Sequence, residues 1–252
     1  MKKINKLLIS AGLLAATSSA QATLINFQAI ADGSQGESAF TTWNTNTAPN
    51  LFGVDIDITA RSNSGVSDSP NNTSTYVYFD AGDAGLGVCS SGVTSTGPST
   101  PSGSGANVCG NPVSAGADDN IDQAGEALIF TFNESTSMDE IWFNNNDDPD
   151  WSLTGDTVVF TLNGGSAVEY MFTAADELDH PSNTKGLGWL FTFDNLAGID
   201  SNFVAGDELT VAYGGRSAEE FYISAINVPE PAIVALLGLG LVGIGFARRS
   251  RK

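Results

Sequence analysis

Residues 157–172 read TVVFTLNGGSAVEYMF, and this stretch decides the fold class. Two runs of mainly β-branched and aromatic residues, 157–162 and 167–172, flank Asn163-Gly164-Gly165-Ser166. An Asn-Gly pair between two such runs is a strong hairpin signal, because both residues tolerate the positive φ of a hairpin turn. The stretch therefore predicts two antiparallel strands.

The same signal recurs along the middle of the chain. Residues 54–59 alternate apolar and polar side chains, which is typical of a half-buried strand. The other predicted strands are 24–30, 75–79, 128–132, 141–143, 189–193, 208–213 and 221–226. One short helical pattern, 174–178, is explained equally well as a turn. About ten strands predict an all-β domain, a two-sheet β-sandwich of jelly-roll type.

The N-terminus differs from this middle part. A basic start precedes an apolar run at residues 7–16 and an Ala-Gln-Ala sequence that ends at Ala22. These are the three parts of a secretory signal peptide, with cleavage by signal peptidase after Ala22. We expect residues 1–22 to be the signal peptide, 23–227 the exported domain and 228–252 a C-terminal tail.

The expected domain is strongly acidic. Of the 29 acidic residues only Glu230 lies in the tail, and seven of the ten basic residues lie in the two ends. The domain thus holds 28 acidic against three basic residues, a net charge of −25. Such a field repels nucleic acid and attracts cations, so nucleic acid is excluded as a partner.

The tail has three parts. Val228-Pro229-Glu230-Pro231 ends the last predicted strand, because two prolines cannot continue a β-ladder. Residues 232–247 are apolar and uncharged, and as a helix they would be about 24 Å long. Residues 248–252 are basic apart from one serine, which keeps them on the cytoplasmic side. We expect a short transmembrane helix with the domain outside.

With these parts in this order, the tail resembles the PEP-CTERM sorting signal of exopolysaccharide-producing Gram-negative bacteria. The same tail is sometimes labelled an ice-binding protein C-terminal domain. The resemblance implies recognition by an exosortase, cleavage near Pro229-Glu230-Pro231, and release to the cell surface or extracellular matrix. Anchoring in the inner membrane would then be transient, and a permanent C-terminal anchor is the alternative.

The two cysteines, Cys89 and Cys109, both lie in the exported domain. An even number in an oxidising compartment predicts one disulfide, which would close a loop of about 20 residues. The loop is mostly Ser, Thr, Gly, Pro and Asn, so it cannot form a core of its own. A catalytic thiol is the weaker reading, because the only histidine, His180, is distant in the sequence.

Acidic residues on either side of this loop are candidate calcium ligands. Ca²⁺ takes six to eight oxygens from carboxylates, amides and carbonyls. The candidates are Asp80, Asp83, Asp119, Asp122 and Glu126. The segment resembles a pattern of exported PEP-CTERM proteins: a Gly-Leu-Gly-Val turn, an Asp-rich turn and a Glu that opens the next strand. The alternative is that these residues only make turns through side-chain to backbone bonds.

A second acidic loop covers residues 144–151. Asn146, Asp148 and Trp151 are candidate sugar-binding residues, because rings stack on sugar faces and polar groups bond their hydroxyls. A solvated turn with Trp151 in the core is the favoured alternative. Paired carboxylates are too numerous here to single out a glycosidase pair, and no catalytic residue is assigned.

Three functions remain for the exported domain. The first is a non-catalytic structural or adhesive module in exopolysaccharide. The second is a carbohydrate-binding module, with or without a dependence on calcium. The third, and the weakest, is a glycan-active enzyme.

Overall fold

The computed structural model describes residues 22–46, 52–62, 75–90, 97–98, 109, 121, 125–145, 152–179, 187–193, 198–214 and 221–229. The chain divides into two compact units. Leu24–Val228 is the β domain, and Met1–Thr23 with Pro229–Lys252 form the other unit. Only Ala22, Thr23 and Pro229 of that second unit are described.

The first sheet has nine strands, and β17 lies in its interior. Its order is β13 (Glu177–Asp179), β14 (Gly188–Thr192), β10 (Glu140–Asn144), β17 (Tyr222–Pro229), β6 (Gly85–Cys89), β5 (Tyr76–Asp80), β2 (Ser38–Phe40) and β7 (Gly97–Pro98). The ninth strand, β1 (Ala22–Asn26), also pairs with β17. The last strand of the described residues, β17, is thus held between β10 and β6 and is joined by the first described strand, β1.

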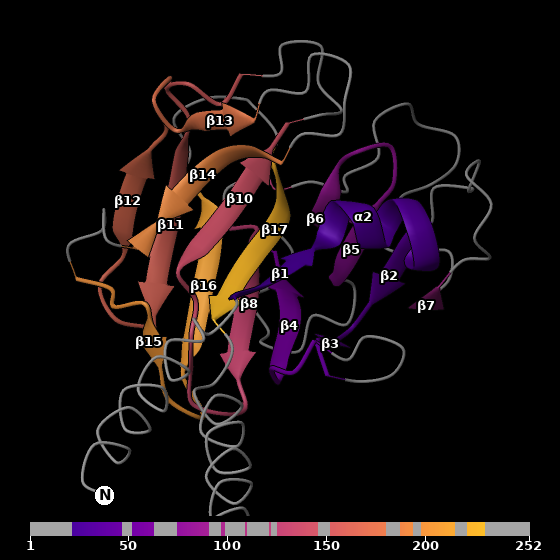
Figure 1. Cartoon of the computed structure of the whole chain (residues 1–252), viewed down its shortest axis with the longest axis horizontal. Coiled ribbons are helices and arrows are strands. Elements are labelled where there is room, and N and C mark those ends of the chain that lie inside the picture. The colour runs from indigo at the N-terminus through magenta and orange to yellow at the C-terminus, as the bar shows by residue number, and fades with distance from the viewer. Residues whose placement is uncertain are drawn as a thin grey trace, which may run out of the picture. The chain divides into compact units, whose positions relative to one another are not determined.

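The second sheet has six strands. Its order is β12 (Val168–Met171), β11 (Thr157–Leu162), β16 (Glu208–Tyr213), β8 (Ala127–Phe132), β4 (Ile56–Arg61) and β3 (Trp43–Asn44). Two short strands, β9 (Thr136–Ser137) and β15 (Asn202–Phe203), pair separately. Figure 1 shows β14, β10 and β17 in one layer in front of β11, β16 and β8 in the other. The prediction of an all-β domain is confirmed, and its layers of antiparallel strands are consistent with a sandwich.

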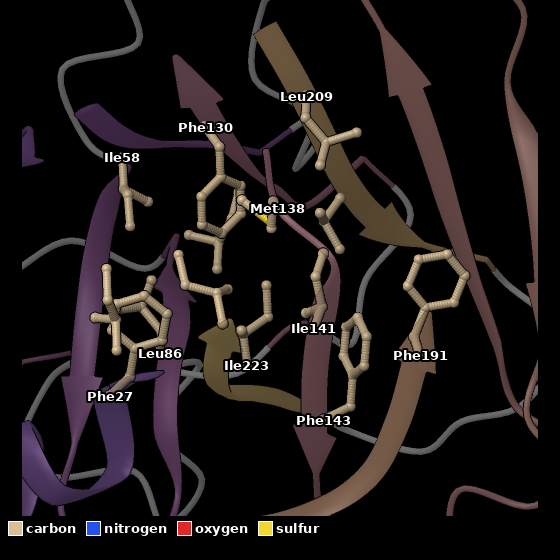
Figure 2. Close-up of a cluster of buried hydrophobic side chains, with 14 of the residues drawn as sticks. Phe27, Ile58, Leu86, Phe130, Met138, Ile141, Phe143, Phe191, Leu209 and Ile223 are labelled. Carbon is tan, nitrogen blue, oxygen red and sulfur yellow. The ribbon is translucent and has the colours of Figure 1, made fainter. Parts of the chain in front are cut away.

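One apolar core lies between the two sheets. Figure 2 shows Leu86, Ile141 and Ile223 of the first sheet directed toward Phe130 and Leu209 of the second. All of these side chains are fully buried members of one cluster. Alternation along the strands produces it, because successive side chains of a strand point to opposite faces. In β4, for example, Ile56 and Ile58 are buried while Asp57 between them is more exposed.

The hairpin of β11 and β12 forms where its sequence predicts it. Phe160 pairs with Val168, and Thr157 pairs with Met171. Asn163 and Gly164 both have positive φ, 50° and 65°, as the favoured hairpin turns require.

Two local expectations are corrected by the structure, and one open alternative is decided. The strand expected at 24–30 ends at Asn26, whose Oδ1 accepts a 2.8 Å hydrogen bond from the Ala29 N–H and caps the short helix α2 (Phe27–Ile30). The Gly-Leu-Gly-Val segment is strand β6, and the turn precedes it at residues 81–84. Of the two alternatives for residues 174–178, the structure has the turn, which covers residues 174–176 and leads into β13.

The predicted signal peptide, apolar segment 232–247 and basic end all lie outside the described residues. Within the described part of the chain, no helix has the length and hydropathy needed to cross a membrane.

Candidate functional site

The turn between β5 and β6, residues 81–84, is surrounded by acidic side chains. A π-helical turn, η1 (Ala31–Gln35), supplies Asp32, whose Oδ1 accepts hydrogen bonds from the N–H groups of Gly82 and Asp83 at 2.8 and 3.2 Å. Glu37 follows it and accepts from the Ala81 N–H at 3.2 Å and from the Tyr78 hydroxyl. These two carboxylates therefore hold the turn in place.

The same turn is fixed from the other side by two amides. The carbonyl oxygen of Asp83 accepts from Gln28 Nε2 at 2.6 Å and from Asn144 Nδ2 at 3.2 Å. Asn144 Nδ2 also donates to the Ala84 carbonyl at 2.7 Å. Gly85 then opens β6 with φ 132°, and a Cβ there would lie 2.7 Å from the Ile223 carbonyl oxygen. Glycine is thus required for the approach of β6 to β17.

The described calcium candidates belong to different sheets. Asp80 ends β5 in the first sheet, and Asp83 lies in the turn that follows. Glu126 is fully buried immediately before β8 in the second sheet, where its carbonyl accepts from the Tyr213 N–H at 3.3 Å. Asp119 and Asp122 lie outside the described residues. No group of three or more His, Cys, Asp or Glu side chains suited to a metal occurs in the described ranges, and calcium stays a prediction.

The predicted disulfide is present. Cys89 at the end of β6 is bonded to Cys109, and the two Cα atoms are 5.6 Å apart. Both cysteines are buried and pack with Ala39 and Tyr78 in a small apolar cluster. Because the chain has only these two cysteines, it has no thiol free to act as a nucleophile.

The carboxylates of Asp55, which precedes β4, and Asp57, on β4, belong to a hydrogen-bond network that the sequence did not predict. Asn44 Nδ2 donates to Oδ1 of both Asp55 and Asp57 at 2.7 Å. Asn133 Nδ2 donates to both carboxylates at 3.0 Å. The Asp55 N–H donates to Glu134 Oε1, also at 3.0 Å. Hydrogen bonds from Asn133 and Asn44 hold the pKa of Asp55 below its usual value. The only sequence signal was the Asp-x-Asp alternation on one face of the strand.

A second carboxylate–amide pair joins the turn after β11 to the turn before β16. Asn163 Nδ2 donates to Asp207 Oδ1, and the Glu208 N–H donates to Asn163 Oδ1, both at 2.8 Å. The other oxygen of Asp207 accepts from the Val204 N–H at 2.8 Å. The hydrogen bond from Asn163 lowers the pKa of Asp207. The carboxylate of Asp207 thus joins the two turns through the hydrogen bonds that it accepts.

Tyr170 on β12 forms a hydrogen bond with another carboxylate, that of Asp176. Its hydroxyl donates to Asp176 Oδ1 at 2.8 Å, and Asp176 Oδ2 accepts from the N–H and hydroxyl of Thr173 at 2.7 and 2.8 Å. Burial, and then Asp176, raise the pKa of Tyr170 to about 12. The folded protein therefore keeps this phenol neutral at pH values where an exposed phenol ionises.

Tyr170→Phe is expected to flatten the alkaline end of the stability profile. The folded pKa lies above the unfolded one, so the contribution of Tyr170 is complete below about pH 10 and is lost as pH rises toward 12. Urea unfolding of both proteins between pH 8 and 12 measures this, with values near pH 8 as the internal reference. Parallel profiles for wild type and variant across that range would contradict the assignment.

The candidate sugar-binding residues Asn146, Asp148 and Trp151 lie outside the described residues, as does His180. The residue before them, Asn145, is described and is only 1% exposed. Neither its Oδ1 nor its Nδ2 has a hydrogen-bond partner among the described residues. Buried side-chain amides are nearly always bonded, which makes Asn145, immediately after β10, an unusual group.

The start of the tail belongs to the folded domain. Strand β17 ends at Pro229, and Val228 is 1% exposed in the main core. Asn227 Nδ2 donates to Glu140 Oε2 at 2.9 Å, and the Asp139 N–H donates to the Asn227 carbonyl at 3.0 Å. Of the predicted sorting residues, Val228 and Pro229 are described, and Glu230 and Pro231 are not.

Residues 227–252 match the family model of the PEP-CTERM protein-sorting motif. The chain therefore carries a PEP-CTERM sorting motif, and this motif supports an exported protein that an exosortase sorts to the cell surface. No curated protein and no solved structure matches the chain. The match covers the tail and leaves the function of the β domain open.

Proposed function

We propose that this PEP-CTERM protein delivers a non-catalytic structural or adhesive module to the extracellular polysaccharide matrix. The sorting motif supports delivery to the surface. The structural role is supported by the hydrogen bonds that the acidic side chains accept within the domain. Asp32, Glu37, Asp55, Asp176 and Asp207 each accept hydrogen bonds that fasten turns or strands. Carboxylates that are bonded in this way make the turns of the domain more rigid, and a matrix component needs a rigid structure.

We infer a jelly-roll topology for this module. The pairing of eight strands supports this topology. In chain order they are β6, β8, β10, β11, β12, β14, β16 and β17. The first pairs with the last, β8 with β16, β10 with β14 and β11 with β12. One long hairpin that rolls up into two sheets has this pairing, and capsid and lectin domains share that architecture. Topology alone does not assign function.

A calcium-dependent carbohydrate-binding module is the second candidate, and Asn145 favours it. The buried amide of Asn145 lacks a partner among the described residues, and Asn146, Asp148 and Trp151 follow it within six residues. The adjoining strand ends are neighbours, since Asn144 pairs with Tyr222 and Phe143 pairs with Trp189. Connections that leave these ends start side by side, as in a loop-built ligand site.

A glycan array with the exported protein, run with calcium and with EDTA, separates the two candidates. The structural module is expected to show no selective glycan binding in either buffer and an unchanged melting temperature in EDTA. It is also expected to appear in the exopolysaccharide fraction of cultured cells.

Calcium-dependent binding of one glycan class, lost in Asn145→Leu and kept in the surface control Asn202→Ala, would replace the first candidate by the second. Turnover of a labelled exopolysaccharide would overturn both, because it would show an enzyme.

A further inference from the structure

The sorting motif and strand β17 overlap in three residues. The motif begins at residue 227, and β17 continues to Pro229. Pro229 and Pro231 lack the N–H that a β-ladder needs, so the strand stops where the Pro-Glu-Pro sequence begins. Only three residues separate Val228 from the apolar run that starts at Ala232.

Residues on the amino side of Pro229 are held by several contacts. Val228 is buried in the core between the sheets. Asn227 pairs with Glu140 of β10 and is bonded through its side chain and its carbonyl. On its other side β17 is joined by β6 and β1. A protease needs its substrate extended and accessible, so bonds inside this paired strand are cut only in an opened state.

We propose that the sorting enzyme acts on the folded domain and breaks an amide C–N bond on the carboxyl side of Val228, no later than Pro231. Water, or a nucleophilic group of the surface acceptor, bonds to the freed acyl carbon. The tail leaves with a new amino group that takes up the nucleophile's proton. Strand β17 stays intact through Val228 in the mature protein, and the fold rather than the motif sets the upstream limit of cleavage. This inference concerns the tail and holds whatever the domain binds.

Intact mass spectrometry of the mature protein, made from the full precursor in a host that contains the exosortase, tests the position. The expected C-terminal residue is Val228, Pro229, Glu230 or Pro231, as a free acid or with an added acceptor mass. A mature chain that ends at Asn227 or earlier would overturn the proposal, because Val228 would then be missing from the core.

A linker variant tests whether the folded strand limits access. Insertion of Gly-Ser-Gly-Ser between Val228 and Pro229 moves Pro-Glu-Pro away from β17 and is expected to speed tail removal several-fold in a pulse-chase experiment. The same four residues inserted after Gly164, in the exposed turn between β11 and β12, are the control and should leave the rate unchanged. Equal rates for wild type and the Val228 insertion would show that the enzyme is not restricted by the folded domain.

The core variant Val228→Ala provides a second readout. It loosens the end of β17 and is expected to add products that end before Val228, while Val204→Ala, at a position 61% exposed, keeps the wild-type mass. A single unchanged mass from both variants would contradict an upstream limit set by the fold.

Discussion

Phe143→Ala is expected to lower the free energy of unfolding by about 3–5 kcal/mol, the usual cost of removing a buried phenylalanine ring. Phe143 is fully buried on β10. Its ring centroid lies 5.2 Å from that of Phe172, 5.6 Å from that of Phe221 and 6.4 Å from that of Phe160, with the rings edge to face. The truncation leaves a cavity where both sheets meet and removes three aromatic contacts.

Denaturant unfolding of the exported protein measures this loss. Leu178→Ala, at a side chain 60% exposed on β13, is the matched control and should change stability by no more than about 0.5 kcal/mol. Similar losses for the two variants would mean that Phe143 does not lie at the centre of the core.

Removal of the disulfide is expected to cost about 2–4 kcal/mol of stability, the second largest effect. The bond joins residues 20 apart and restricts the unfolded chain. Its loss also disturbs the cluster of Ala39 and Tyr78 around the two cysteines. The double variant Cys89→Ala/Cys109→Ala avoids a stray thiol, and its melting temperature is compared with that of wild type.

Reductant provides the control for this comparison. Dithiothreitol should lower the melting temperature of wild type toward that of the double variant and leave the double variant unchanged. A wild-type protein equally stable with and without reductant would show that the bond contributes nothing to the folded state.

Local sequence patterns predicted the longer strands well. β16 has the predicted bounds, and the Asn163-Gly164 turn has the predicted positive φ values. Alternation and turn chemistry depend on neighbouring residues, so one sequence contains the whole signal. Strands of two or three residues, such as β2, β3, β9 and β15, are too short to show a pattern and were missed.

Strand β6 shows why other parts were misread. The resemblance to exported PEP-CTERM proteins implied a turn at this Gly-Leu-Gly-Val segment, yet it is a strand, and Gly85 is needed because the Ile223 carbonyl approaches it from across the sheet. Gly188 is similar: it has φ 93°, and a Cβ there would collide with the Phe143 carbonyl. A close approach between residues distant in sequence leaves no local signal.

The sequence alone determined the sorting motif of this protein, its all-β class and its disulfide. Each of these depends on contiguous segments or on a single possible cysteine pair. Only the tertiary structure decided how the acidic residues are used. Asp55 and Glu134 are 79 residues apart and Asp207 and Asn163 are 44 apart, yet each pair is joined by a hydrogen bond. The fold also placed Val228 of the sorting motif in the core, because β17 pairs with strands from distant parts of the chain.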